Sequence, residues 1–184
     1  NLNSIMVGAL GTMEAVGFFT TGNKVVSLVM TIITAVTSTI IPRMSYLGGN
    51  GKEEEAVFLQ KKTINLLNYM SLPMIAGLVI LAKPIILVFS GEEFLPSVIV
   101  LQILSFLLIV IPWSSFLGLQ ILYPIRKEKY GNYAVIIGAL VNLVLNFFLI
   151  PRYAYVGVAV SVVCAETVIT LAVSYTHLRA HETK

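Results

Sequence analysis

The sequence contains few of the residues from which catalytic and metal sites are built. Its 184 residues include no aspartate, one cysteine and two histidines, and both histidines lie within the last eight positions. This scarcity excludes disulfide frameworks, Cys/His zinc sites and Ser–His–Asp constellations. We therefore predict a protein that is not an enzyme and that needs neither a metal nor a cofactor.

Charge is scarce as well. Only 11% of the residues are charged, whereas a soluble domain carries roughly 25%. The net charge of +3 is too small and too scattered for a nucleic-acid surface, so no nucleic-acid partner is expected. In place of charge, 57% of the residues are hydrophobic and the mean hydropathy is +0.90. This is the composition of an integral membrane protein.

Hydrophobic stretches divide the chain into transmembrane segments. A helix rises 1.5 Å per residue, so about 20 residues cross the hydrocarbon core. No stretch alternates with a sustained period of two, which argues against strands. We predict an all-α polytopic transmembrane helix bundle with one partial helix, five full ones, a kink at Pro112 and a short interfacial helix at 83–89. The expected membrane helices are 1–10 (partial), 16–46, 63–82, 96–122, 133–150 and 156–173.

The segment 174–184 departs from this pattern, because the apolar sequence stops at Val173. One interpretation is a short cytoplasmic extension after the last helix. The other is that the segment resembles a translated sequencing adapter, which makes it a non-native or disordered tail. We favour the second interpretation and assign no function to its two histidines.

Basic residues indicate how the bundle is oriented. Connections alternate between the two sides of the membrane, and the side richer in Lys and Arg usually faces the cytoplasm. On that basis 48–62 and 126–131 are predicted to be cytoplasmic. One side carries Arg43, Lys52, Lys61, Lys62, Arg126, Lys127 and Lys129, and the other carries only Lys83 and Arg152.

A polar stripe runs along the first full helix. Its members recur at spacings of three and four residues, which places them within a sector of about 80° at 100° per residue. Hydroxyls at such spacing are typical either of helix packing or of the wall of a hydrophilic pathway. The stripe consists of Thr20, Lys24, Ser27, Thr31, Thr34 and Ser38.

Lys24 favours the second interpretation. An ammonium group within a membrane is costly and usually faces a water-filled cavity or a partner. The alternative is snorkelling, since Lys24 lies about two turns from the outer end of the predicted helix. We favour a cavity-facing cation suited to anionic substrate groups.

Three other polar residues lie inside predicted membrane helices. Asn142 and Asn146 are one turn apart, so both either hydrogen-bond a neighbouring helix or line the cavity. Glu166 lies near the middle of the last helix. It is either protonated and packed, paired with a basic residue, or part of an ion-coupling site.

Several phrases of the sequence resemble a known family. Together and in this order, they are similar to the polysaccharide transporter branch of the MATE-like exporter superfamily, the O-antigen and capsule repeat-unit flippases of the Wzx type. The resemblance covers the second lobe of that family, here 1–173. The phrases are VGFF (16–19), IPRMS (41–45), FSGEEF (89–94) with LQIL (101–104), QILYP (120–124) with RKEK (126–129), and NLVLN (142–146) with IPRY (150–153).

The resemblance implies a two-lobed transporter with a central, often cationic cavity, located in the bacterial cytoplasmic membrane. Such a protein moves an undecaprenyl-pyrophosphate-linked oligosaccharide across the membrane by alternating access. The implied partners are this substrate, membrane lipids, a coupling ion (H⁺ or Na⁺) and a missing N-terminal lobe. The family usually has an acidic residue where Asn3 or Ser4 stands, so no function is carried over there. Alternatives are a MATE-type drug/cation antiporter and a peptidoglycan lipid-precursor flippase.

Overall fold

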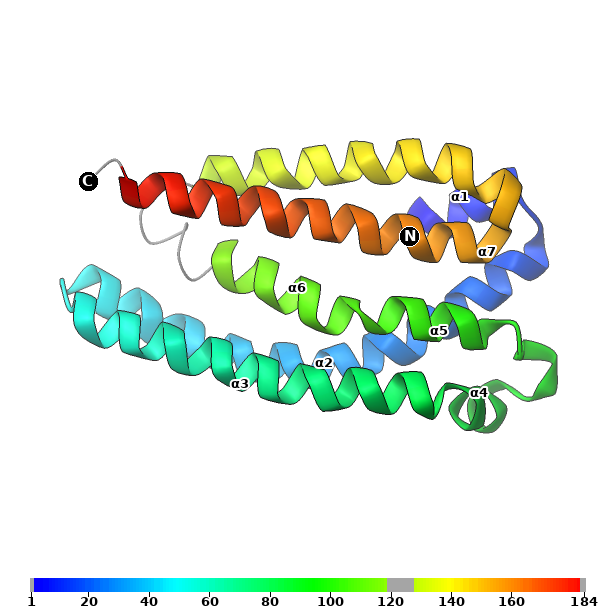
Figure 1. The fold of residues 1–184 in the computed structure, drawn as a ribbon, viewed down its shortest axis with the longest axis horizontal. Coiled ribbons are helices and arrows are strands. Elements are labelled where there is room, and N and C mark those ends of the chain that lie inside the picture. The colour runs from blue at the N-terminus through cyan, green and yellow to red at the C-terminus, as the bar shows by residue number, and fades with distance from the viewer. Residues whose placement is uncertain (1, 119–127, 183–184) are drawn as a thin grey trace.

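The described part of the chain is an elongated bundle of helices. A computed structural model describes residues 2–118 and 128–182, and all regular secondary structure in these ranges is helical (Figure 1). The all-α polytopic fold class is therefore confirmed, with four segments long and apolar enough to cross a membrane. The elements are α1 (Leu2–Leu10), α2 (Met13–Gly49), α3 (Glu53–Ile80), α4 (Ala82–Ser90), the 3-10 helix η1 (Glu92–Phe94), α5 (Ser97–Ser105), α6 (Leu107–Ser115) and α7 (Glu128–Glu182).

Successive connections lie at alternate ends of the bundle. The turn between α2 and α3 lies at one end, together with the end of α6 and the start of α7 (Figure 1). The turn between α1 and α2, helix α4 and η1 lie at the other end. The connections 48–62 and 126–131 were predicted to be cytoplasmic, and the helix ends next to both of them lie at the same end of the bundle. Residues 119–127 lie outside the described residues.

Helix α7 reverses direction at Ala154 and is two antiparallel halves. Ala154 has φ 46° and ψ −124°, values that no α-helix contains. The halves approach closely next to this turn, because a Cβ added at Gly157 would lie 2.5 Å from the carbonyl oxygen of Leu149. The backbone of the second half continues as helix through Glu182. The non-native origin of 174–184 stays a prediction.

Helices α2 and α3 extend beyond the apolar stretches that mark them. Their 37 and 28 residues correspond to about 55 and 42 Å, against a hydrocarbon core of about 30 Å. The sequence shows a polar connection over 48–62, whereas α3 already begins at Glu53. Three glutamates in its first turn favour a helix start, because carboxylates there interact well with the helix dipole.

The stretch predicted as one helix over 96–122 is one candidate membrane span in its described part, Ser97–Gly118, with a turn at Phe106 that divides α5 from α6. Pro112 lies inside α6, and the kink predicted there stays a prediction. Pro112 has no N–H to donate to the carbonyl of Leu108. The hydroxyl of Ser71 in α3 donates to that carbonyl instead, at 2.7 Å. This cross-helix bond replaces the missing intrahelical bond.

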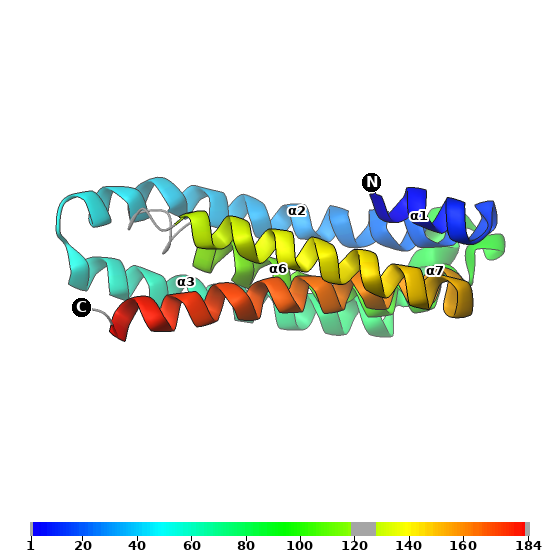
Figure 2. The ribbon, with the colours of Figure 1, turned by 90° about the horizontal axis from the view of Figure 1, so that it is seen from above.

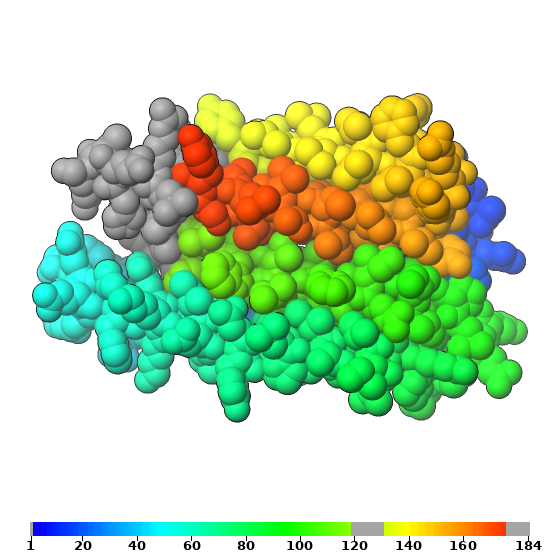
Figure 3. Space-filling view, viewed as in Figure 1, coloured from blue at the N-terminus to red at the C-terminus, as the bar shows by residue number. Residues whose placement is uncertain are grey.

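Helix α5 lies at the centre of the bundle and packs against α2, α3 and α7. Val100, Leu101 and Leu104 are fully buried. Gly22 of α2 permits a close approach, since a Cβ there would lie 2.8 Å from Cγ1 of Val100. Figure 3 shows the face formed by α3, α5, α6 and α7, and Figure 2 shows α2 along one edge of the bundle. Helix α2 therefore turns one face to the core and leaves another uncovered.

Candidate functional site

The polar stripe lies on the uncovered face of α2. Lys24, Thr31 and Ser38 are exposed, as are Ser27 and Thr34, while Thr20 is half-buried. The large residues that α2 buries, such as Phe19 and Ile33, lie on the side facing the core. None of the helices in the described ranges covers the stripe. Its polar face is therefore available to a molecule or protein part outside this bundle.

The hydroxyls of the stripe are partly satisfied by their own helix. Thr20 donates to the carbonyl of Val16 at 2.8 Å, and Ser38 donates to that of Ala35 at 2.8 Å. Thr31 and Thr34 make equivalent bonds at 2.9 and 3.1 Å. A hydroxyl that donates its hydrogen in this way keeps an oxygen that accepts hydrogen bonds. The stripe thus presents a row of acceptors, which suits ligands rich in O–H donors.

Lys24 adds a cation to this row. Its side chain is exposed and makes no ion pair with any residue in the described ranges. Helix α2 begins at Met13, three residues before the predicted start, so Lys24 lies about three turns from the helix end. Because the start of a helix does not fix the membrane boundary, snorkelling stays the alternative for Lys24. An ammonium group supplies the hydrogen-bond donors that the hydroxyls lack.

Asn142 and Asn146 do not join the stripe, because both are buried where α7 meets α1. The side-chain amide of Asn146 donates to Oδ1 of Asn3 at 2.9 Å and to Oδ1 of Asn142 at 3.1 Å. These contacts are those of an amide pair bound to a neighbouring helix. A cavity-lining role for the pair stays a prediction. Sequence reasoning assigned no role to Asn3, since no local pattern links residues 143 positions apart.

Glu166 is half-buried in the second half of α7. One turn later, the hydroxyl of Thr170 donates to the carbonyl of Glu166 at 2.9 Å and to that of Val110 in α6 at 3.2 Å. The carboxylate of Glu166 makes no hydrogen bond or ion pair within the described ranges. No cluster of three or more His, Cys, Asp or Glu that could hold a metal ion is present in those ranges. Its role in ion coupling stays a prediction.

Other polar side chains at membrane depth hold the helices together. The indole N–H of Trp113 in α6 donates to Oδ1 of Asn68 in α3 at 2.9 Å. The amide of Gln102 in α5 donates to the carbonyl of Val79 in α3 at 3.1 Å. These bonds, with that from Ser71, join α3 to α5 and α6. They leave the α2 stripe as the main polar surface of the described ranges that has no partner on another helix.

Comparison with known proteins supplies the identity that geometry alone does not give. A family profile described as "Polysaccharide biosynthesis protein" matches residues 1–99, more than half of the chain. The chain belongs to this polysaccharide biosynthesis family. The match confirms the resemblance to the polysaccharide transporter branch of the MATE-like superfamily. The chain is thus a multi-pass protein of the bacterial inner membrane.

Relatives of this polysaccharide biosynthesis protein are named as transporters and flippases. A probable low-salt glycan biosynthesis flippase of Haloferax volcanii is 27% identical over 96% of the chain, and a putative O-antigen transporter of Escherichia coli is 26% identical over 90%. The fold is similar to that of the lipid II flippase MurJ in an inward closed conformation, with a TM-score of 0.80 and 17% identity over 96% of the chain.

The family member described here spans about two fifths of the length of these relatives. It covers 36% of the Haloferax protein, 40% of the Escherichia coli protein and 39% of the MurJ chain. The shared fold therefore corresponds to about two fifths of each of these relatives.

Proposed function

We propose that this chain forms one lobe of a flippase for lipid-linked oligosaccharides. The substrate would be a polysaccharide repeat unit on an undecaprenyl pyrophosphate carrier, moved across the cytoplasmic membrane by alternating access. A second lobe would face the uncovered side of α2, and the transport pathway would lie between the two lobes. No bond in the substrate would be broken, so the protein would not act as an enzyme.

The observation that carries this proposal is the uncovered polar face of α2. It extends from Thr20 to Ser38 and includes a cation without a partner in the described ranges. A pyrophosphate and sugars do not cross hydrocarbon unaided, because desolvating charges and hydroxyls is costly. The names of the relatives point to the same class of substrate.

The chemistry of the stripe fits the two polar parts of such a substrate. Lys24 would donate hydrogen bonds to the pyrophosphate, and the hydroxyl oxygens would accept hydrogen bonds from sugar hydroxyls. The prenyl chain would stay in lipid. Hydration lost by the headgroup would thus be replaced during the crossing.

The Lys24 variants test this proposal in the membrane protein that contains this chain. We expect Lys24→Ala to lower export of surface polysaccharide about ten-fold or more, because a hydrogen bond to a charged group contributes about 1.5–3 kcal/mol. Lys24→Arg should keep part of the activity, since the charge remains while its geometry changes. Lys83→Ala, at an exposed lysine of α4 outside the stripe, is the control and should export normally. Normal export by a well-expressed Lys24→Ala variant would refute the cationic pathway.

The hydroxyls allow a second test on the same helix. Thr39 is exposed on α2 and bonds its own helix at 2.7 Å, but it lies outside the stripe. We expect Thr31→Val combined with Thr34→Val to lower export, whereas Thr39→Val should leave it unchanged. Equal effects of the double variant and of Thr39→Val would indicate a helix-stability effect and not substrate contact.

The drug/cation antiporter is the weaker alternative. An antiporter of this superfamily would favour acidic residues in its cavity, and the uncovered face of α2 carries a cation and hydroxyls instead. A peptidoglycan lipid-precursor flippase would use the same carrier chemistry. Complementation of strains that lack each kind of flippase separates these two substrates directly.

A further inference from the structure

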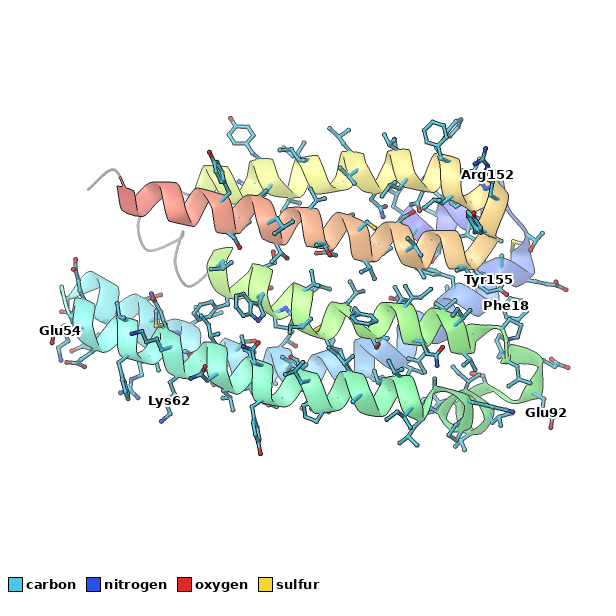
Figure 4. The ribbon with its side chains drawn as sticks, in the orientation of Figure 1. Phe18, Glu54, Lys62, Glu92, Arg152 and Tyr155 are labelled. Carbon is cyan, nitrogen blue, oxygen red and sulfur yellow. The ribbon has the colours of Figure 1, made fainter. Side chains whose placement is uncertain are left out.

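A groove of mixed charge lies where the projecting ends of α2 and α3 meet. It has a volume of about 330 Å³. The walls are apolar, from Leu47, Phe58 and Leu59, and the charges are Arg43, Lys62, Glu54 and Glu55. Figure 4 shows Glu54 and Lys62 at this end of the bundle, opposite Glu92 and Arg152. The transport pathway proposed above does not use this groove.

The depth of the groove follows from the apolar stretches on either side. The stretch beginning at Thr63 follows directly after Lys62, so Lys62 lies at the membrane surface. Arg43 lines the same groove from α2, the helix that runs antiparallel to α3. Both cations therefore lie at the level of lipid headgroups. Exposed Phe58, 71% accessible, is an aromatic side chain at the same boundary.

The glutamates lie farther from the membrane than the cations. Glu54 precedes Lys62 by eight residues on α3, which corresponds to about 12 Å along the helix. A lysine side chain at a membrane surface can extend toward water, which would shorten this separation. Lys52 bonds Oε1 of Glu55 at 2.8 Å. Glu54 makes no ion pair within the described ranges and remains the uncompensated carboxylate.

We propose that this groove binds the headgroup of a phospholipid that carries a primary amine, of the phosphatidylethanolamine type. The phosphate would lie between Arg43 and Lys62 at the membrane surface, and the ammonium would lie beyond it, near Glu54. The acyl chains would run down into the bilayer. The order of charges from the membrane outward thus matches the order of charges in the headgroup. A purely anionic lipid would bring no cation to Glu54 and would fit less well.

Native mass spectrometry of the membrane protein that contains this chain tests the proposal, with short-chain phosphatidylethanolamine and phosphatidylglycerol as ligands. We expect about five-fold tighter binding of phosphatidylethanolamine, since solvent-exposed charge pairs are individually weak. Equal or tighter binding of phosphatidylglycerol would overturn the proposal.

Charge-neutral variants assign the binding to this groove. Arg43→Gln combined with Lys62→Gln should weaken phosphatidylethanolamine binding about five-fold. Glu54→Gln should instead abolish the preference over phosphatidylglycerol. Lys61→Gln is the matched control, because Lys61 is exposed beside Lys62 but does not line the groove. Phosphatidylethanolamine binding by this variant should stay unchanged. A loss as large in Lys61→Gln would show diffuse attraction and overturn the proposal.

A charge-conserving pair separates the ligand contact from damage to the fold. Arg43→Lys combined with Lys62→Arg keeps both cations, so we expect it to bind phosphatidylethanolamine more tightly than the neutral pair. Binding no better than that of the neutral pair would refute a role for the two charges. Flippase activity is not part of this assay, so its result is independent of the function proposed above.

Discussion

Two of the uncovered helix faces in the described ranges differ in chemistry. The uncovered face of α2 carries Lys24 and a row of hydroxyls. Between Tyr133 and Phe148, the exposed side chains of the first half of α7 are all apolar or aromatic, and most of them are large. The large ones are Tyr133, Val135, Ile136, Ile137, Leu140, Leu143, Val144, Phe147 and Phe148.

The difference indicates what each face contacts. Lipid tails satisfy an apolar face fully, so the surface of α7 needs no further partner. Hydroxyl oxygens and an ammonium group find no hydrogen bonds in hydrocarbon. The face of α2 is therefore suited to water, to a polar ligand or to another protein part. The same bundle thus has an apolar side on α7 and a polar side on α2.

A lysine placed on each face should separate them most strongly. Leu140→Lys puts a charge on the apolar side of α7 near the middle of a membrane segment, and we expect an insertion penalty of about 2.5–3.5 kcal/mol and poor membrane yield. Thr31→Lys puts the same charge at a similar depth on the α2 stripe and should insert almost normally. Quantitative insertion assays measure both.

Equal penalties for these two lysines would contradict the distinction. In that case α2 would face lipid as α7 does, and the hydroxyls would serve only to satisfy their own helix. Leu140→Met and Thr31→Ser provide matched controls for the disturbance caused by substitution at each position.

The two faces were predictable from sequence to different degrees for a physical reason. Helical periodicity is local, so the spacing of Thr20 through Ser38 predicts one polar face without knowledge of the neighbours. The side on which that face would lie relative to the core depends on packing. The structure shows that the core side of α2 is the opposite one, where Gly22 meets Val100.

Contacts between distant segments were not predictable in this way. The bond from Asn146 to Asn3 joins α1 to the first half of α7, and the groove joins residues of two helices through their projecting ends. The projecting start of α3 was missed because hydropathy marks where a helix crosses lipid and not where it begins. The turn at Phe106 between α5 and α6 carries no Pro or Gly, so no local sequence feature indicated it.

The covered face of α2 allows a second, smaller test of the comparison. A methyl group added by Gly22→Ala would lie 2.8 Å from Cγ1 of Val100 and 3.1 Å from the backbone nitrogen of Leu101. We expect this overpacking to cost about 1–3 kcal/mol and to lower the thermal unfolding midpoint. Gly77→Ala in α3 is the control, because nothing lies within 4 Å of its added Cβ.

The control should be neutral or slightly stabilising, since alanine is favoured over glycine inside a helix by roughly 0.5–1 kcal/mol. An unfolding midpoint for Gly22→Ala equal to that of the control would mean that α2 and α5 separate easily. The face of α2 that packs on the core would then be less well defined than the structure indicates.

The smallest effect is expected at Glu166, the carboxylate in the second half of α7. A sodium site needs several oxygen ligands around a carboxylate, and a proton relay needs a group that exchanges the proton with it. The described surroundings of Glu166 offer chiefly Thr170, whose hydroxyl already donates to two carbonyls. We therefore expect Glu166→Gln to transport its substrate at nearly the wild-type rate, with an unchanged dependence on sodium and pH.

Transport assays in vesicles with imposed sodium or proton gradients measure this, and Glu14→Gln, at the exposed start of α2, controls for the loss of one negative charge. A flattened ion dependence in Glu166→Gln alone would show that this carboxylate couples ions, with ligands contributed from outside the described bundle. The polar side of the lobe would then include α7 as well as α2.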